Sequence, residues 1–291
     1  MVWDFLKKLF AAPVDAASLD KSERPAQPAS KQPRATGVSS PGHPARSAPA
    51  AEPPPTDPTA DAAWQAANDA RTQFYTREFG PLPDDILKML DMTGAWPGGG
   101  LYVIAADRIA PGAVVHATFG FTNPDMPTTC VLEDVEYRHD ELGRPTGATG
   151  NLRRKPRAAV APGLAGYGYE LVIVTDGDAG DWPLYLLQWV VGAELRNDVG
   201  LLQRVETYDG LTVEDLQVGP EESVHVLIAK ARVPLPATID LPNGHSHLLV
   251  MTVITDAEMQ WSMEHGRMAL LDKLVAAGVG QVSRRGRASA V

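Results

Sequence analysis

The sequence predicts an α+β or mixed α/β sandwich, in which a central mixed β-sheet packs against helices and a disordered N-terminal tail precedes the domain. Short runs of β-branched residues are interspersed with amphipathic helical segments. The two kinds of segment do not alternate strictly, as a doubly wound parallel sheet would require. Eleven of the 25 prolines lie before residue 61, which marks a boundary between tail and folded chain.

The composition divides the chain into four segments. Residues 1–10 (MVWDFLKKLF) place apolar side chains at helical spacing and lack the uninterrupted apolar core of a secretory signal. This peptide is a weak membrane-surface contact, a docking peptide for a partner's groove, or a frayed terminus. Residues 11–60 are rich in Ala and Pro, which predicts a disordered linker. The folded domain is expected over 61–278, and residues 279–291 are expected to be a basic, flexible tail.

Helical patterns occur at four places in the domain. Three of them are expected at 61–80, 83–92 and 182–197. The last helix begins with a T-x-x-E capping box, in which the Thr255 side chain and the Glu258 carboxylate bond each other's backbone N–H groups. Its apolar face continues to Gly278.

Strand patterns separate these helices. Runs rich in β-branched residues predict strands at 101–105, 113–121, 128–138, 166–175, 223–231 and 245–254. Residues 138–166 are polar and rich in Gly and Pro, so they predict an exposed loop that includes the basic stretch LRRKPR.

Charge and cysteine usage limit the classes of function. Residues 61–278 carry 16 basic and 30 acidic groups, a net charge of −14. Nucleic-acid binding needs a basic stripe, so an acidic body disfavours it and favours a cationic protein partner. The single cysteine, Cys130, excludes an intramolecular disulfide framework and suits a reducing, cytoplasmic compartment. No transmembrane segment is expected.

The stretch GYGYELVIVT (166–175) combines a glycine pair with a carboxylate. A dinucleotide-binding fingerprint needs its glycines after a strand, where they open a helix, whereas these glycines precede the strand. Tyr167 and Tyr169 alternate with the glycines and therefore share one packed face. Glu170 is expected to accept hydrogen bonds from donors at the strand entrance, and no cofactor-binding motif is found.

His245 and His247 are the candidate metal ligands. Positions i and i+2 of a strand project from one face, so both rings could reach one ion if His225, Asp240 or Glu258 supplied a third ligand. The alternative is that these histidines cap a strand entrance. A metal-dependent hydrolase is the enzymatic hypothesis that this pair supports. The DGDAGD stretch (176–181) lacks the glycine and glutamate of a calcium loop and predicts a solvated turn.

Two acidic runs are either solvated surface or a partner-binding surface that attracts a basic protein. The first contains Glu133, Asp134, Glu136, Asp140 and Glu141, and the second Glu206, Asp209, Glu214, Asp215, Glu221 and Glu222. The candidate partner-binding residues are Glu133, Asp134, Glu136, Glu206, Asp209, Glu214 and Asp215.

Four segments in order resemble the suppressor-of-fused domain family. They are VVHATFGFTN (114–123), GYGYELVIVT (166–175), DWPLYLLQWVV (181–191) and PNGHSHLLVMTVITDAEMQWSMEHG (242–266). The first resembles the family's strand that enters an S/T-x-G turn, and the second its G-[YF]-G-[YF]-E-L segment. The residues that carry the resemblance are Gly166, Gly168, Tyr169, Glu170, Trp182, Pro183, Asn243 and Gly244. The ordered set covers roughly residues 95–276 and is most similar to bacterial single-domain members.

The resemblance implies a non-enzymatic, protein-binding α/β domain. Animal members restrain a transcription factor by gripping a short peptide as an added β-strand. Because the additional C-terminal lobe of the animal protein has no expected counterpart here, no peptide-contact residues are carried over. Bacterial single-domain members are regarded as immunity proteins of toxin systems, which implies that this chain neutralises a cognate toxin by occlusion. The alternative is a regulatory scaffold that binds a protein or peptide and is tethered by residues 1–10.

Overall fold

A computed structural model describes most of the domain. Its described residues are 58–84, 90–91, 94–95, 99–139, 145–156, 161–177, 179–197, 199–219 and 222–291. For 58–60, 90–91, 94–95, 128–139, 145–156 and 196 only the backbone is described. The predicted amphipathic peptide (1–10) and most of the predicted linker (11–57) lie outside these residues, as does most of the helix expected over 83–92. Where that helix was expected to end, residues 90–91 instead form a strand.

The core of the protein is one mixed sheet, which confirms the predicted fold class. Its six-strand path runs β3-β4-β7-β11-β9-β8, with β10 paired to β11 and β12 paired to β7. The parallel pairs are β7 with β11 and β7 with β12, and the others are antiparallel. The strands are β3 (Gly100–Ala105), β4 (Val114–Phe119), β7 (Leu164–Thr175), β8 (Leu211–Gln217), β9 (Ser223–Lys230), β10 (Thr238–Leu241), β11 (Gly244–Ile254) and β12 (Val282–Ser283).

Continuous apolar runs place β7 and β11 at the centre of the sheet. Residues 171–174 and 248–251 are fully or almost fully buried on both faces. Such runs suit strands that are covered on both sides, where alternation with polar residues would bury unpaired groups. The parallel register of the two strands sets Leu171 opposite Leu249 and Val172 opposite Val250.

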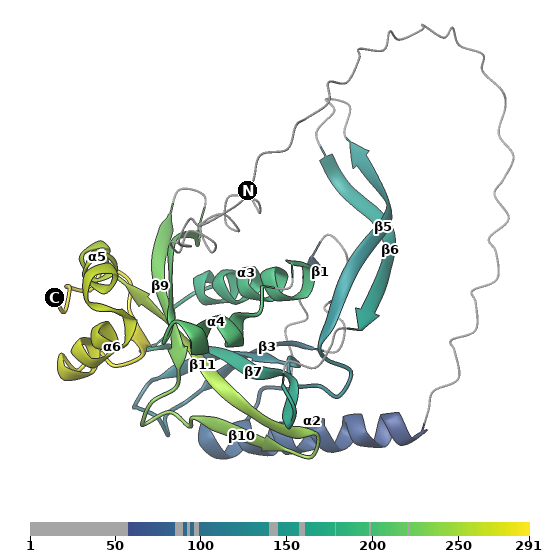
Figure 1. The fold of residues 1–291 in the computed structure, drawn as a ribbon, viewed down its shortest axis with the longest axis horizontal. Coiled ribbons are helices and arrows are strands. Elements are labelled where there is room, and N and C mark those ends of the chain that lie inside the picture. The colour runs from purple at the N-terminus through teal and green to yellow at the C-terminus, as the bar shows by residue number, and fades with distance from the viewer. Residues whose placement is uncertain are drawn as a thin grey trace, which may run out of the picture.

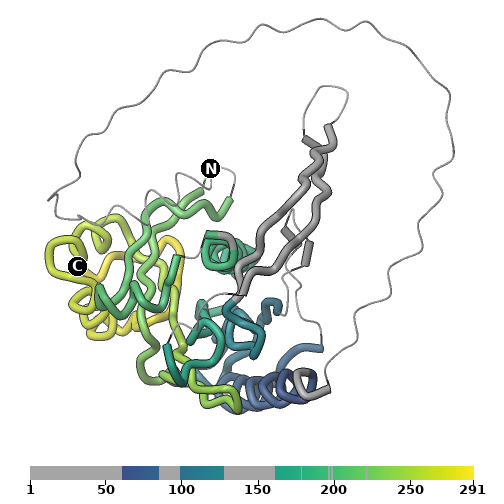
Figure 2. The backbone as a smooth tube through the Cα atoms, turned by 45° about the vertical axis from the view of Figure 1, so that its right-hand side comes forward, coloured from purple at the N-terminus to yellow at the C-terminus, as the bar shows by residue number. Residues whose placement is uncertain are grey.

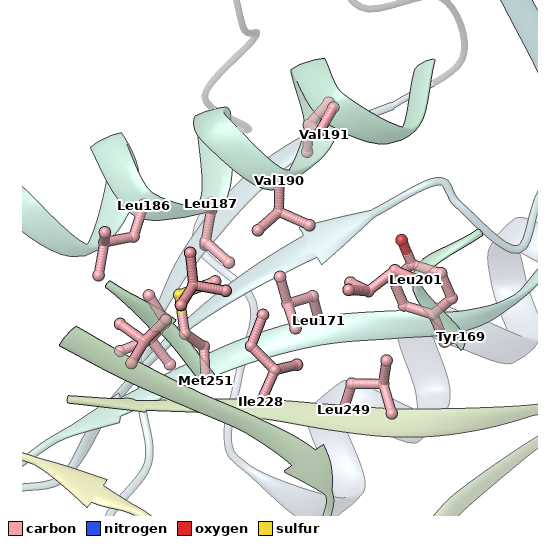
Figure 3. Close-up of a cluster of buried hydrophobic side chains, with 14 of the residues drawn as sticks. Tyr169, Leu171, Leu186, Leu187, Val190, Val191, Leu201, Ile228, Leu249 and Met251 are labelled. Atoms are coloured by element: carbon pink, nitrogen blue, oxygen red, sulfur yellow. The ribbon is translucent and has the colours of Figure 1, made fainter. Parts of the chain in front are cut away.

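Helices α3 (Trp182–Asn197) and α4 (Leu201–Thr207) cover one face of this sheet. Figure 3 shows Leu186, Leu187 and Val190 of α3 directed toward the side chains of Leu171 and Met251. The bounds of α3 agree with the predicted helix, with Pro183 in its first turn, where a missing N–H costs nothing.

The opposite face is covered by three helices in two groups. Helix α2 (Pro58–Glu78) packs Phe74, Tyr75 and Phe79 against β4, β7 and β10 (Figures 1 and 2). Helices α5 (Asp256–His265) and α6 (Arg267–Ala276) pack on the β9 side of the same face. The result is a helix–sheet–helix sandwich.

One predicted loop is a strand. Residues 138–166 were expected to be exposed loop, but β6 (Pro145–Pro156) pairs antiparallel with β5 (Thr128–His139) and contains most of the LRRKPR stretch. The two form a two-stranded sheet of their own. Backbone pairing in such a ribbon needs no alternating apolar pattern, so the sequence carried no strand signal there.

The last predicted helix is two helices. Gly266, with φ of 93°, caps α5 and opens α6, because a left-handed residue cannot continue an α-helix. The predicted capping box is confirmed: Thr255 Oγ1 accepts the Glu258 N–H, and a Glu258 carboxylate oxygen accepts the Thr255 N–H.

The C-terminal segment is docked rather than flexible. The sequence predicted a mobile basic tail over 279–291, but β12 extends the sheet beside β7 and Gln281 is buried. Arg284, Arg285 and Arg287 each pair with a carboxylate of the domain. Arginines whose partners are distant in sequence look like an unpaired basic run, which explains the error.

Gly166 and Gly168 permit the irregular start of β7. Their φ angles are +56° and +80°. A Cβ on Gly166 would lie 2.1 Å from the Phe121 carbonyl oxygen, and one on Gly168 would lie 2.7 Å from Leu202 Cδ2. Both glycines therefore allow a positive φ and a close approach of β7 to neighbouring atoms. Tyr167 and Tyr169 are buried on one face, as predicted.

We expect Gly166→Ala to lower the free energy of unfolding by at least about 3 kcal/mol, because backbone must move to admit the methyl group. Gly180→Ala is the matched control. Gly180 has a φ of +65° and nothing within 4 Å of its Cβ position, so only left-handed strain of about 1 kcal/mol applies. Urea unfolding measures both, and equal losses would contradict the close-approach explanation.

Candidate functional site

Four hydrogen bonds converge on the Glu170 carboxylate in the described core. Its side chain is fully buried at the entrance of the regular part of β7. Oε2 accepts the Thr118 hydroxyl at 2.7 Å, and Oε1 accepts the Thr122 hydroxyl at 2.7 Å. Oε1 also accepts the backbone N–H groups of Gly120 (3.0 Å) and Thr122 (3.1 Å). The structure confirms that this carboxylate serves donors at the strand entrance.

Arg71 of α2 supplies the countercharge. Its Nη1 lies 3.6 Å from Glu170 Oε1 and donates to Thr122 Oγ1 at 2.8 Å, while Nη2 donates to Asn123 Oδ1 at 2.6 Å. The guanidinium carbon stands 4.1 Å from the centroid of the Phe119 ring. Burial lowers the pKa of Arg71, although the Glu170 carboxylate opposes that shift. The pair therefore needs its hydrogen bonds as well as its charges.

The sequence patterns did not identify Arg71 as a functional or structural residue. It lies on the buried stripe of α2 with Ala67, Phe74 and Tyr75. A basic residue on the apolar face of a predicted helix is the signal that could have identified a buried acidic partner, because a charge is rarely buried unpaired. Burial also raises the pKa of the Tyr75 hydroxyl well above its usual range.

Two other buried carboxylates have comparable structural partners. A Glu194 carboxylate oxygen accepts the Tyr169 hydroxyl at 3.3 Å and the Leu201 N–H at 3.0 Å, which ties β7 to the start of α4. Glu258 accepts two bonds of 2.6 Å from Arg287 and one of 2.8 Å from the Ala290 N–H. These contacts tie α4 to the sheet and α5 to the C-terminal segment.

The remaining residues of the family resemblance also act on the fold. Trp182 is buried at the start of α3, and the Asn243 amide donates to the Thr122 carbonyl at 2.9 Å. Gly244 has a φ of +134°, and a Cβ there would lie 2.6 Å from the Gly163 carbonyl oxygen. Asn243 thus links the β10–β11 turn to Thr122, which itself donates to the Glu170 carboxylate.

The predicted histidine pair does not gather a set of metal ligands. The His245 and His247 rings are perpendicular, with centroids 6.5 Å apart, and the pairing of β11 with β7 is irregular between them. His247 Nε2 lies 3.4 Å from Lys230 Nζ and 3.6 Å from Glu206 Oε1. Burial and the Lys230 ammonium lower the pKa of His247.

Of the three suggested third ligands, only Asp240 lies beside the pair, opposite His245 on β10. Glu258 binds Arg287, and His225 lies opposite Ile254 at the far end of β11. In the parts of the chain that the structure describes, no three His, Cys, Asp or Glu side chains are grouped so as to hold a metal ion.

The acidic candidates divide among separate places. Glu133, Asp134 and Glu136 belong to β5, where the structure describes only backbone. Glu206 pairs with Lys230 at 2.7 Å, and Asp209 occupies a left-handed turn position with φ of 52°. The structure therefore does not bring all seven predicted residues together.

Glu214 and Asp215 form part of a local acidic cluster. They interrupt the regular pairing of β8 with β9, and Asp215 has a φ of 50°. The Asp215 N–H donates to His225 Nδ1 at 3.1 Å, and His225 Nε2 lies 3.3 Å from Asp256 Oδ1. The Asp256 side chain is 95% exposed. We name Glu214, Asp215 and Asp256 the acidic corner.

Comparison with known proteins identifies the family to which the chain belongs. The sequence profile of the suppressor of fused protein (SUFU) family matches residues 99–288, about two thirds of the chain. The chain belongs to the suppressor of fused protein family. Members of this family are non-catalytic, protein-binding domains. Helix α2, with Arg71, lies before the matched residues.

Solved structures of SUFU proteins resemble this fold at low sequence identity. A chain of the Sufu–Fu complex is 15% identical, with 78% of this chain and 92% of that chain covered and a TM-score of 0.42. A SUFU homolog from Neisseria gonorrhoeae is 14% identical, with 79% and 98% covered and a TM-score of 0.44. Drosophila Suppressor of Fused is 13% identical, with a TM-score of 0.42, and the match covers 78% of this chain and 51% of that protein.

No curated protein matches the chain. A search of the described helices for a membrane span finds none that combines the necessary length with the necessary apolar character.

We expect Glu170→Gln to lower the free energy of unfolding by about 3–5 kcal/mol, because Arg71 would stay buried without a countercharge. Glu222→Gln, which removes a carboxylate from an exposed pair with Arg285, should change stability by less than about 1 kcal/mol. Denaturant unfolding of both variants makes the comparison. A Glu170→Gln protein as stable as the parent would exclude a structural role for the pair.

Glu258 predicts a pH dependence. Burial opposes its ionisation, but the bonds from Arg287 and from the Thr255 and Ala290 N–H groups outweigh burial and lower its pKa below the ordinary value of 4.5. Its stabilisation is therefore complete above that value and is lost as pH falls through the lower folded pKa. Glu258→Gln should flatten the loss of stability below about pH 4.5, whereas Glu264→Gln, on the exposed part of the same helix, should leave it in place.

Proposed function

We propose that this SUFU-family domain binds a protein partner without catalysing a reaction, and that it neutralises a cationic toxin by covering it. Family membership is the observation that carries the protein-binding part of the proposal. The resemblance to bacterial single-domain members supports the immunity role. The interior agrees with a binding function, since Glu170, Glu194 and Glu258 are each committed to structural hydrogen bonds.

Charge supports a basic partner. The folded part of the sequence is strongly acidic, and the acidic corner presents its carboxylates at the β8 edge of the sheet. Complementary charge raises the rate of encounter more than it raises affinity. Glu214 and Asp215 form a bulge where they interrupt the pairing of β8 with β9. A bulge disfavours the pairing of an edge strand with a further strand, so side chains rather than backbone would meet the partner.

Co-expression tests the immunity role. We expect this chain to restore growth to a host that expresses a toxic product of an adjacent gene, and to copurify with that product in fixed stoichiometry. The proposal would be contradicted if the product of the adjacent gene were harmless, or if it stayed toxic when this chain is co-expressed. Deleting residues 1–57 distinguishes the neutralising domain from the tethered scaffold. The scaffold would lose its function without its tether, whereas a neutralising domain would keep it.

The acidic corner gives a kinetic prediction. Glu214→Gln/Asp215→Asn should slow association with the cationic partner about five- to tenfold at low salt and leave dissociation nearly unchanged. Asparagine tolerates the left-handed backbone of position 215, so the bulge is retained. Asp61→Asn/Asp69→Asn, on exposed positions of α2, is the control for loss of two charges. Stopped-flow measurement at two salt concentrations distinguishes them, and equal effects of both double variants would remove the acidic corner from the interface.

A further inference from the structure

Arg267 differs from the other arginines of the C-terminal part of the chain. Four of these pair with a carboxylate: Arg232 with Asp272, Arg284 with Asp176, Arg285 with Glu222 and Arg287 with Glu258. For Arg267, the described residues provide no ion pair, and its Nε is buried without a hydrogen-bond partner. An unpaired, partly buried arginine is unexpected in a chain with ten more acidic than basic groups.

The surroundings of Arg267 hold it in place. It is the first residue of α6, after a Gly266 cap that supplies no side-chain acceptor. Its Cβ lies 3.4 Å from the position that a Cβ on Gly210 would take, so the turn between α4 and β8 rests against its stem. Burial lowers the pKa of Arg267, and Tyr208 is the one titratable group of the described chain that opposes this shift.

This arrangement has an unmet requirement for an anion. The buried Nε–H is out of reach of a partner, whereas the Nη groups are neither buried nor hydrogen-bonded within the described chain. A cation at the start of a helix also faces the positive end of the helix dipole. One carboxylate would accept from the guanidinium, and its charge would suit the helix terminus. The planar guanidinium offers parallel N–H groups that match both oxygens of a carboxylate.

The position of Arg267 relates it to the acidic corner. The acidic corner joins the middle of β8 to the start of α5 through His225, whereas Arg267 follows the end of α5 and contacts the turn that begins β8. Strand β8 and helix α5 therefore connect two sites of opposite charge. Figure 1 shows α5 and α6 together beside β9.

From these contacts we infer that Arg267 and Tyr208 form a binding site for an Asp or Glu side chain of the protein partner. The inference rests on the proposed protein-binding function and adds a point of recognition to it. Tyr208 is 43% exposed at the end of α4, and it lies two residues before Gly210, whose turn contacts the Arg267 stem. Tyrosine and arginine are the residue types that most often dominate binding energy at protein interfaces.

A surface site of this kind fits a side chain carried by a protein better than a free anion. One shallow cavity, of about 270 Å³, lies elsewhere, between α2 and β10, and is lined by residues that include Phe74, Arg77 and Asp240. At Arg267 the bound carboxylate would remain partly open to solvent, so neighbouring contacts of a protein partner would add to its affinity.

The site is tested on the full chain without the natural partner. The probe is N-acetyl-glutamate methylamide, and its glutamine analogue is the matched control. We expect the ¹⁵N–¹H signal of Arg267 Nε to shift saturably with the glutamate probe, with an affinity about tenfold higher than for the glutamine analogue. Equal shifts with both probes, or with sodium chloride at the same ionic strength, would overturn the inference.

Variants separate recognition from packing. Arg267→Met keeps an apolar stem against Gly210 but should abolish binding of the glutamate probe, which can be followed through the Tyr208 ring signals. Tyr208→Phe should weaken binding of the probe about threefold if the hydroxyl donates to it. Arg285→Met removes a paired surface arginine and should leave binding unchanged. Retained binding by Arg267→Met would assign the arginine to packing alone, and because no partner is present, that failure would leave the proposed function untouched.

Discussion

The buried carboxylate of Glu170 is the interaction on which the rest of the fold depends. At the entrance of the central strand it accepts hydrogen bonds from β4 and from the turn that follows β4, and it is the countercharge of Arg71 on α2. Each of those donors would otherwise be buried without an acceptor, which costs more than the net value of a formed bond. Arg71 then fixes α2 over the sheet, and Asn243 brings the β10–β11 turn to the same point through the Thr122 carbonyl. One buried carboxylate therefore helps to position four elements.

The same arrangement determines where function can reside. Glu194 joins β7 to α4 and Glu258 joins α5 to the C-terminal segment, so the described buried carboxylates are all acceptors for structural donors. An acid or base catalyst must instead reach a substrate proton from within a cleft. These three carboxylates therefore serve the fold, and the family to which the chain belongs is one of protein-binding domains.

Local signals in the sequence predicted the elements whose causes are local. The capping box at Thr255, the proline in the first turn of α3 and the apolar run of β7 each act within a few residues, and each is confirmed. Most of the errors concern pairing between separate segments, although the break of the last helix at Gly266 is local. Strand β6 is specified by its pairing with β5, and the docking of residues 284–287 by carboxylates up to 108 positions earlier, at Asp176. Arg71 of α2 belongs to this class, since its partner Glu170 lies on strand β7 and a composition-based search cannot relate the two.

The candidate interface combines two effects that charge alone cannot supply. An acidic surface attracts many basic proteins and therefore selects weakly among them. A fixed arginine at the other end of β8 and α5 would repel a uniformly basic surface and accept only one that carries a carboxylate at the matching place. The acidic corner would then govern how fast a partner arrives, and Arg267 which partner stays and in what orientation. Because a rim charge alters association and a desolvated pair alters dissociation, the two contributions are separable in rate constants rather than in affinity.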